Sequence, residues 1–285
     1  MNPIQQNELV VSATNGNKEA LQAILEEIQD LVFNLSLRML GNTADAQDAS
    51  QDILIKIITR LDSFSQKSSF QTWVYRIAVN YLIDYKKSMF AQHPLNFEFY
   101  AADTQSGFMS YTPDMMMGKS EDELAWELRM SCTNVMLQCF DPETRCIFIL
   151  GTMFHLDSTI AGEIFDITPA TYRQKLSRAR KKMADFLSVN CGLTETGCCN
   201  CKKRIGNALI QHRLDPTHME YQRLDPLDHS LLQETTEHMV EIDKMVPVFE
   251  DLPNYHSPIA VKEFITGLLN SNDMKAIQQY KEKIS

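Results

Sequence analysis

The most restrictive feature of the sequence is a pair of helical patterns separated by a very short turn. The first pattern opens at Asp157 or Ser158 and ends near Phe165. The second opens with Thr168 in the capping position and Pro169 at the first helical position. Two short helices joined in this way form a helix-turn-helix pattern, whose second helix can enter the major groove of DNA. The sequence therefore predicts a helical DNA-binding unit here.

The second helix of this pair carries concentrated positive charge. The stretch from Thr168 to Lys182 holds six basic residues and no acidic one, although the whole chain has a formal net charge of -10. Leu176, Ala179 and Met183 lie three and four residues apart, so they can face a core and leave the basic side chains on an exposed arc. The alternative is a solvated basic helix without a ligand. The candidate DNA-binding residues are Ala170, Thr171, Arg173, Gln174, Lys175, Arg178 and Lys181.

The composition indicates a folded chain without a membrane anchor. It has 285 residues, of which 44% are hydrophobic and 22% charged, enough for one large domain or two smaller ones with real cores. No run approaches the roughly 20 apolar residues that cross a bilayer, and the first residues lack the pattern of a signal peptide. We therefore expect a cytoplasmic protein without membrane insertion.

Helical spacing dominates the rest of the chain, and strand signals are nearly absent. Gly41 and Asn42 are expected to end the first of these helices, and Asn42 or Thr43 can cap the next one. The segment 88–120 has no clean period and is expected to be a linker. Further helices are predicted, besides the pair above, at about 17–39, 43–61, 72–87, 228–246, 258–269 and 272–283. Helices are also expected to begin near Glu121 and at Asp141, which directly precedes Pro142 and can cap the helix.

Three stretches carry a family resemblance. They are "RMLGNTADAQDASQDILIKI", "SSFQTWVYRIAVNYLIDYKK" and "LDSTIAGEIFDITPATYRQKLSRARKK". In order and spacing they resemble regions 2 and 4 of bacterial RNA polymerase sigma factors of the extracytoplasmic-function (ECF) class, over about residues 8–187. The resemblance implies an all-α protein that directs core RNA polymerase to promoter DNA and is not itself an enzyme. It also implies an anti-sigma factor as a candidate partner.

The resemblance also implies a domain organisation. A region 2 domain that binds core polymerase and the minus-ten promoter element would span 8–87, and a region 4 helix-turn-helix domain that binds the minus-thirty-five element would span 121–187, joined by a flexible linker at 88–120. A helical, Cys-containing acidic extension would follow at 188–285. Met115, Met116 and Met117 in the linker would dock in the polymerase cleft or cover the core of the second domain.

Two sets of site residues in region 2 follow from the resemblance. Asp45, Asp48, Gln51 and Asp52 would form the polar face that binds core polymerase, unless they are an ordinary solvated helix face. The second set would bind the minus-ten promoter element, where bases leave the stack and lie on aromatic and basic groups. Trp73 in this set is equally a candidate for core packing, because Ile77 lies four residues away. The minus-ten candidates are Lys67, Ser68, Phe70, Trp73, Arg76 and Asn80.

One position departs from the family pattern in the turn of the helix-turn-helix. Asp166 stands where such sigma factors usually have glycine. Aspartate tolerates the left-handed backbone better than most residues, so we expect the turn to survive.

The cysteines of the extension are the unusual feature. Cys198 and Cys201 form a CxxC, and Cys191 and His212 lie nearby in sequence. These four residues supply the ligand types of one zinc ion, and no other cofactor is expected. The alternatives are a metal or redox function on one side and reduced structural thiols on the other. A stand-alone helix-turn-helix regulator whose cysteines sense metal or oxidants is therefore the rival to a sigma factor.

The last part of the chain is acidic. From Leu214 to Ser285 there are 13 acidic residues and 6 basic ones. An acidic tail beside a basic helix leads to the hypothesis that the tail folds back on that helix and lowers the DNA affinity of the free chain.

Overall fold

The computed structural model describes residues 3–85, 87, 89–194, 196–227, 247–250 and 252–271. Within these ranges the chain is built from helices, and one isolated β-bridge joins Pro226 to Tyr255. The predicted all-α fold class is therefore confirmed for this part of the chain.

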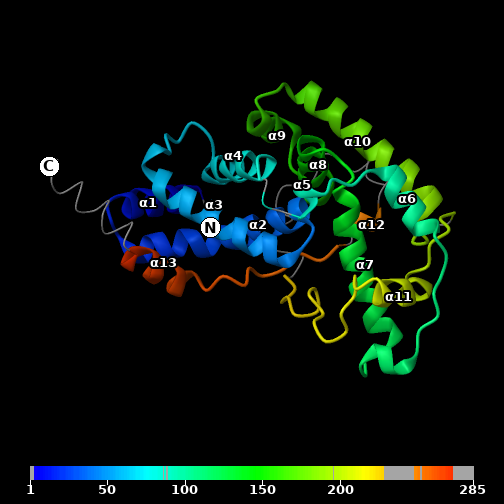
Figure 1. Cartoon of the computed structure of the whole chain (residues 1–285). Coiled ribbons are helices and arrows are strands. Elements are labelled where there is room, and N and C mark those ends of the chain that lie inside the picture. The colour runs from blue at the N-terminus through cyan, green and yellow to red at the C-terminus, as the bar shows by residue number, and fades with distance from the viewer. Residues whose placement is uncertain are drawn as a thin grey trace.

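The helices follow one another along the chain as labelled in Figure 1. Of the three helices predicted in the last third, the one at 258–269 corresponds to α13, whereas those at 228–246 and 272–283 lie outside the described residues. Short 3-10 turns are η1 (Leu61–Ser63) and η2 (Pro113–Met116), and η3 (Ile149–Met153) is a π-helical turn. The α-helices are α1 (Pro3–Thr14), α2 (Lys18–Leu40), α3 (Thr43–Arg60), α4 (Phe70–Ile83), α5 (Met89–Gln92), α6 (Phe97–Gln105), α7 (Glu121–Leu137), α8 (Pro142–Phe148), α9 (Ser158–Phe165), α10 (Pro169–Asn190), α11 (Cys201–Ile210), α12 (Pro247–Glu250) and α13 (Val261–Asn270).

The first helical unit is a bundle in which α2 packs against α1, α3 and α4. Gly41 ends α2 with φ of +80°, in the left-handed region that favours glycine. Asn42 caps α3, because its side chain accepts a hydrogen bond from the amide of Asp45. The predicted break at Gly41 and Asn42 is confirmed, and α4 begins at Phe70, slightly before its predicted start at Thr72.

The second helical unit is formed by α7 to α10, and polar side chains mark the starts of its helices. Ser120 and Glu123 form a reciprocal capping box at α7. Asp141 caps α8 directly before Pro142, and Thr168 caps α10, both as predicted. Local sequence therefore fixes where these helices begin.

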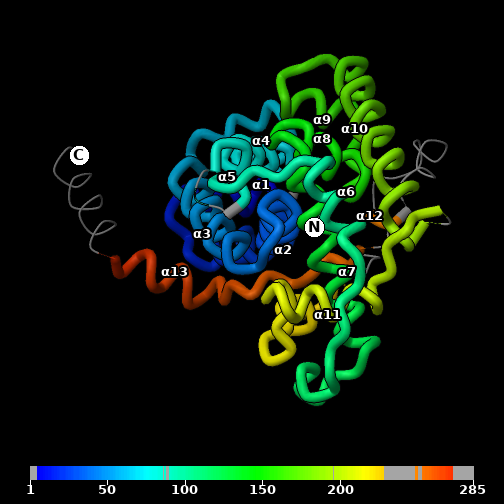
Figure 2. The backbone as a smooth tube through the Cα atoms, turned by 45° about the vertical axis from the view of Figure 1, so that its right-hand side comes forward, coloured from blue at the N-terminus to red at the C-terminus, as the bar shows by residue number. Residues whose placement is uncertain are grey.

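One continuous hydrophobic core joins the two helical units, which lie against each other in Figures 1 and 2. Polar contacts reinforce this junction. Arg145 of α8 donates to the carbonyl oxygen of Met39 at 2.7 Å, and Arg38 of α2 donates to the Asn134 side chain of α7 at 2.9 Å. Both guanidinium groups are buried, and burial lowers the pKa of Arg145 to about 10.

The predicted linker is held against the second unit. Its segment α6 places the Phe97 ring 5.1 Å from the ring centroids of both Phe140 and Phe186. Tyr100 is buried and donates to the carbonyl oxygen of Cys132 at 3.2 Å. In this arrangement the segment 88–120 contributes α5, α6 and η2 to the packed structure.

The extension begins with α11, which packs against α7 and forms a second, smaller apolar core. Met115 and Met116 of the predicted linker pack against this core, whereas Met117 is 63% exposed. Met115 and Met116 therefore pack on α7 of the second unit where it meets α11, and docking in the polymerase cleft stays a prediction. The buried members of this smaller core are Leu124, Ile205, Ala208, Leu209, Leu214 and Met219.

The segment 252–260 forms a strap that runs along the first unit toward α13 (Figure 2). The Asn34 side chain of α2 donates to the Tyr255 carbonyl at 2.7 Å and accepts from the Tyr255 amide at 2.8 Å. Asp30 accepts from the Ser257 amide at 2.6 Å. Because α13 also packs against α2, the extension is fastened to the first unit at several points.

Candidate nucleic-acid interface

The helix-turn-helix pair is formed by α9 and α10, with a left-handed residue at the turn. Asp166 has φ of +54° and ψ of +44°, and its amide donates to the Gly162 carbonyl. The prediction that aspartate accommodates the turn is confirmed. Close packing favours glycine at position 162, because a Cβ there would lie 2.8 Å from the Ile167 carbonyl oxygen. A larger residue at position 162 would require the turn to shift.

Helix α10 presents most of its candidate residues to solvent. Thr171 and Lys175 are half-buried, and the other five are exposed. Arg173 donates to the Ser158 hydroxyl at 2.8 Å, and the Lys175 ammonium lies 2.5 Å from a Glu143 carboxylate oxygen. The exposed set consists of Ala170, Arg173, Gln174, Arg178 and Lys181. This arc has the composition and position expected of a major-groove helix.

Arg180 is the exception to the exposed arc. It is 1% exposed, and it donates to the Thr152 hydroxyl at 3.0 Å and to the Gly151 carbonyl at 2.8 Å. The neighbouring Lys182 ammonium lies 4.8 Å from the centroid of the Phe97 ring, a cation-π contact with the predicted linker. The prediction that all the basic side chains lie on the exposed arc is therefore wrong for Arg180, which supports the fold.

The acidic face of α3 holds the candidate polymerase-binding residues. Asp48 is exposed, and Asp45, Gln51 and Asp52 are half-buried. The Tyr81 hydroxyl of α4 donates to Asp52, and Lys87 lies 3.8 Å from the same carboxylate. The pKa of Tyr81 is raised, first by burial and then by this hydrogen bond.

Two tyrosines were missed by the sequence analysis at this face. Burial first, and then the charges of Asp45, Asp48 and Asp52, raises the pKa of Tyr85, which lies one turn beyond Tyr81. Tyr81 lies in α4 and Tyr85 two residues after its end, with their ring centroids 5.6 Å apart, and only the tertiary packing places both beside α3. The four predicted residues thus lie together on one polar face, beside the phenol groups of Tyr81 and Tyr85.

The minus-ten candidates lie around the start of α4 and divide by exposure. Lys67, Arg76 and Asn80 are exposed, whereas Phe70 is 1% exposed. The Phe70 ring centroid lies 5.6 Å from that of Trp73, which is half-buried. Phe70 is thus not available to stack on a base in this arrangement.

Helix α4 also touches the helix-turn-helix directly. Arg76 donates to the backbone carbonyl of Glu163 in α9 at 2.8 Å. The Tyr75 ring lies 6.5 Å from that of Phe154, between η3 and α9. The minus-ten candidates of the first unit therefore meet the helix-turn-helix unit in space, a contact that no local pattern indicated.

The cysteines are all free thiols. Cys139 and Cys146 are buried among apolar core residues. Four others line a cavity of about 20 Å³ beside Arg129, and burial raises the pKa of one of them, Cys199, to about 11. These four are Cys132, Cys191, Cys199 and Cys201.

The predicted zinc ligands do not come together as a set. Cys198 and His212 are exposed, whereas Cys191 and Cys201 are half-buried. Among the described residues, no group of three or more His, Cys, Asp or Glu side chains is arranged to hold a metal ion. Zinc at these residues stays a prediction. In the same part of the chain, no helix has both the length and the apolar character of a membrane span.

The comparisons with known proteins agree on one family. The Sigma-70 region 2 family model matches residues 24–89. The ECF RNA polymerase sigma factor SigW of Bacillus subtilis is 29% identical over 170 residues, covering 59% of this chain and 89% of the relative. The ECF RNA polymerase sigma-E factor of Haemophilus influenzae is 25% identical over 173 residues, covering 61% of this chain and 90% of the relative.

A solved structure is also similar: CnrH in complex with the cytosolic domain of CnrY, with a TM-score of 0.46 and 17% identity, covering 64% of this chain and 96% of that chain.

The helix-turn-helix, the region 2 match and these relatives define an RNA polymerase sigma factor. The chain belongs to the ECF class of sigma factors, in the sigma-70 region 2 family. It is accordingly a non-catalytic subunit that directs RNA polymerase to promoters, as the sequence predicted.

Proposed function

We propose that this sigma factor rests in a closed state, in which its two DNA-binding units lie together and the C-terminal extension holds them there. The exposed arc of α10 reads the minus-thirty-five element. The loop before α4 and the exposed residues of α4 bind the minus-ten element. The acidic face of α3 docks on core polymerase.

The observation that carries this proposal is the contact of α4 with α9 through Arg76 and the Glu163 carbonyl. The two promoter elements are about 25 base pairs apart, which is roughly 80 Å of B-DNA at about 3.4 Å per base pair. Helices in direct contact do not reach both elements at once. The two units must therefore separate before the protein can bind a whole promoter.

The extension is built to oppose this separation, because it contacts both units. The Phe249 ring of α12 is buried and packs edge-on against Phe148 of α8, with ring centroids 5.3 Å apart. A few residues later the strap bonds to Asn34 of α2 through Tyr255, and Arg38 donates to the carbonyl of Pro253. Moving the units apart breaks one of these two sets of contacts.

The hypothesis that the tail covers the basic helix stays a prediction, because residues 228–246 and 272–285 lie outside the described residues. The described part of the tail contacts α2 through α13, α7 through Tyr221, and η3 and α8 through α12. A tail that clamps the units lowers promoter binding without covering a phosphate-binding side chain. An anti-sigma factor that favours or releases the closed state stays a prediction.

Run-off transcription tests the proposal. Core polymerase is supplied with genomic DNA fragments and either the full chain, the Phe249→Ala variant, or the Phe108→Ala variant as a matched control. Phe108 is 51% exposed and outside the strap. We expect discrete transcripts with the full chain and several-fold more with Phe249→Ala only.

Different results would contradict the promoter-reading assignment and the closed state held by the extension. Absence of transcripts together with absence of core binding would contradict the promoter-reading assignment itself. Equal transcription by the three proteins, with all three folded by circular dichroism, would contradict the clamp alone.

A further inference from the structure

A cavity of about 620 Å³ lies where four parts of the chain meet. Its walls come from the turn between α2 and α3 at Gly41, from the predicted linker, from α7 and from the extension. Cavities of about 300–1,000 Å³ are the usual size of small-molecule sites. None of the functions assigned above uses this space.

Large apolar side chains form one part of the cavity wall. They include Phe90 and Phe99 of the predicted linker and Leu128 and Val135 of α7. Phe99 is 57% exposed, so much of its ring can still be removed from water. A ligand with an apolar body would cover this surface.

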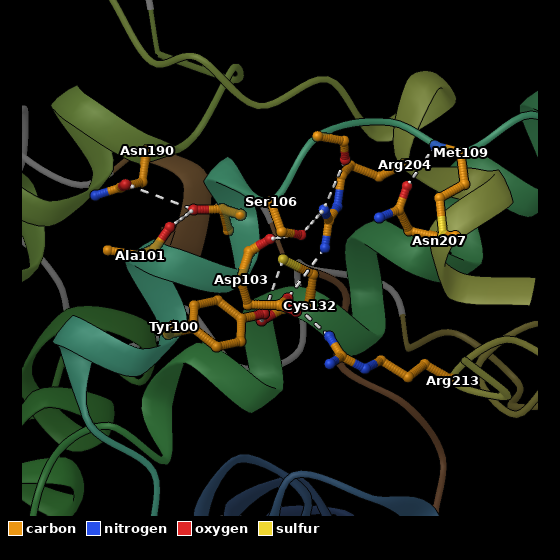
Figure 3. Close-up of polar contacts among 12 residues, drawn as sticks. Tyr100, Ala101, Asp103, Ser106, Met109, Cys132, Asn190, Arg204, Asn207 and Arg213 are labelled. Atoms are coloured by element: carbon orange, nitrogen blue, oxygen red, sulfur yellow. Dashed lines mark hydrogen bonds and ion pairs between the residues drawn. The ribbon is translucent and has the colours of Figure 1, made fainter. Parts of the chain in front are cut away.

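The positive charges of the wall lie together on one side and are already paired, as Figure 3 shows. The Asp103 carboxylate accepts from Arg204 at 3.0 Å and from Arg213 at 2.7 Å. Arg204 also donates to the Ser106 hydroxyl and to the carbonyl of Gly107. Two guanidinium groups thus share one carboxylate, and their remaining excess is a single positive charge on this side.

The other three carboxylates of the wall have only neutral partners. Glu220 accepts from the Thr43 hydroxyl at 2.9 Å. Asp215 accepts from the amide and the hydroxyl of Thr217, and Glu127 accepts from two backbone amides of the extension. Within the described part of the chain, none of these three carboxylates forms an ion pair. With four carboxylates against two guanidinium groups, and with its histidines neutral, the wall is negative overall.

Glu127 and Glu220 are close enough to affect each other. Burial raises the pKa of Glu127, the backbone amides of residues 220–222 oppose this shift, and the charge of Glu220 adds to it. The charge of Glu220 thus disfavours the ionised form of its neighbour. A cation bound beside both carboxylates would offset this repulsion, and the partly buried position strengthens the attraction.

An aromatic ring borders the same end of the cavity. Glu220 bonds to Thr43 in the first turn of α3. Two residues earlier, a Cβ on Gly41 would lie 3.0 Å from a ring carbon of Phe90. Carboxylates and aromatic rings together bind organic cations, because the face of the ring attracts positive charge. A bare metal ion is less suited, since no three His, Cys, Asp or Glu side chains in the described part of the chain are arranged to hold one.

We propose that this cavity is a binding site for a small organic cation with an apolar body, of the substituted ammonium or amidinium class. Its charge lies beside Glu220 and Glu127 and next to the Phe90 ring, and its body extends along the apolar wall that includes Phe99. Because the walls belong to both units and to the extension, a bound ligand favours the closed state. This last consequence rests on the proposed function, whereas binding itself does not.

Two fluorescent probes of closely similar shape test the charge and the pocket together. Thioflavin T carries a permanent positive charge on a flat aromatic body, and its uncharged benzothiazole analogue lacks the ring N-methyl group that creates the charge. We expect saturable binding of a single cationic probe per full-length chain, about tenfold tighter than the neutral probe, because one charge contact and one cation-π contact add about this much. Fluorescence titration gives both affinities, and calorimetry gives the stoichiometry.

Point variants assign the binding to this cavity. Ser131 lies on the wall and is half-buried, so Ser131→Phe fills the space and abolishes saturable binding of both probes. Glu220→Gln removes the preference for the cationic probe and keeps binding of the neutral one. Ser188→Phe on the exposed side of α10 and Glu8→Gln on the exposed side of α1 are the matched controls, and both retain the wild-type affinities.

Equal affinities of the wild-type chain for the two probes would overturn the proposal. So would cation binding that survives Ser131→Phe or keeps its full preference in Glu220→Gln, since either result places the charge of the probe elsewhere on the molecule. These outcomes do not depend on transcription, so a failure here leaves the closed state and the promoter-reading assignment untouched.

Discussion

Helices α4 and α10 were both predicted to bind promoter DNA, and both are amphipathic, yet they use their side chains differently. On α10, Arg178 and Lys181 face solvent, and one cation, Arg180, is buried. On α4, Phe70 is buried and Arg76 is bonded to the backbone of α9. A helical pattern identifies which residues share a face, but a neighbouring element decides whether that face is free.

The difference has a geometric cause. Helix α4 is packed between its own bundle, through α2 and α3, and the second unit, through α8 and α9. Helix α10 packs on α8, α9 and α6, all on its apolar side. The four experiments below test this contrast.

The largest effect is expected for Phe70→Ala. Truncation of a fully buried phenylalanine removes its packing and leaves a cavity, so the free energy of unfolding falls by about 4 kcal/mol. Urea denaturation followed by circular dichroism measures this loss, with exposed Phe108→Ala as the control. If Phe70→Ala instead kept full stability and lost only promoter opening, the ring would be a DNA contact and not a core residue.

For Arg180→Ala we expect the free energy of unfolding to fall by about 3 kcal/mol, because the Gly151 carbonyl and the Thr152 hydroxyl lose a buried donor. Arg178→Ala, two residues away on the exposed arc, should change stability by less than about 0.5 kcal/mol. It should instead weaken promoter binding by the holoenzyme. Thermal and urea denaturation of both variants separate the roles, and equal losses would remove the distinction between buried and exposed cations on α10.

For Asp166→Ala, at the turn before α10, we expect the free energy of unfolding to fall by about 1 kcal/mol. Alanine is less suited than aspartate to the left-handed backbone at φ of +54°. Asp166→Gly should be within about 0.5 kcal/mol of the parent, because glycine adopts this conformation readily. Urea denaturation of the two variants measures the difference, and equal stability of both would show that the turn is unstrained.

The smallest stability effect is expected for Lys175→Ala. Its ion pair with Glu143 is half-exposed, and such pairs contribute less than about 0.5 kcal/mol. If Lys175 contacts a phosphate when DNA is bound, its removal lowers the magnitude of the slope of log binding constant against log salt concentration by about one, for holoenzyme binding to a mapped promoter. The same measurement on Lys67→Ala, before α4, tests for a phosphate contact in the first unit. An unchanged slope for both variants would exclude phosphate contacts at these lysines.

The sequence predicted the local features of the fold because they depend on neighbouring residues. Gly41, Asn42, Asp141 and Thr168 act through hydrogen bonds and backbone angles within a few positions of themselves. The helix-turn-helix was predicted on the same basis, whereas the left-handed turn at Asp166 was predicted from the family resemblance, which places glycine there.

Only the tertiary structure decided which of these surfaces are covered. The pairing of Asn34 with Tyr255 joins residues 221 positions apart, and the contact of Arg76 with Glu163 spans 87 positions. No periodicity or capping rule acts over such separations. The sequence by itself determined two helical DNA-binding units and their family, whereas long-range packing decided that they meet, that a strap joins them, and that a cavity remains between them.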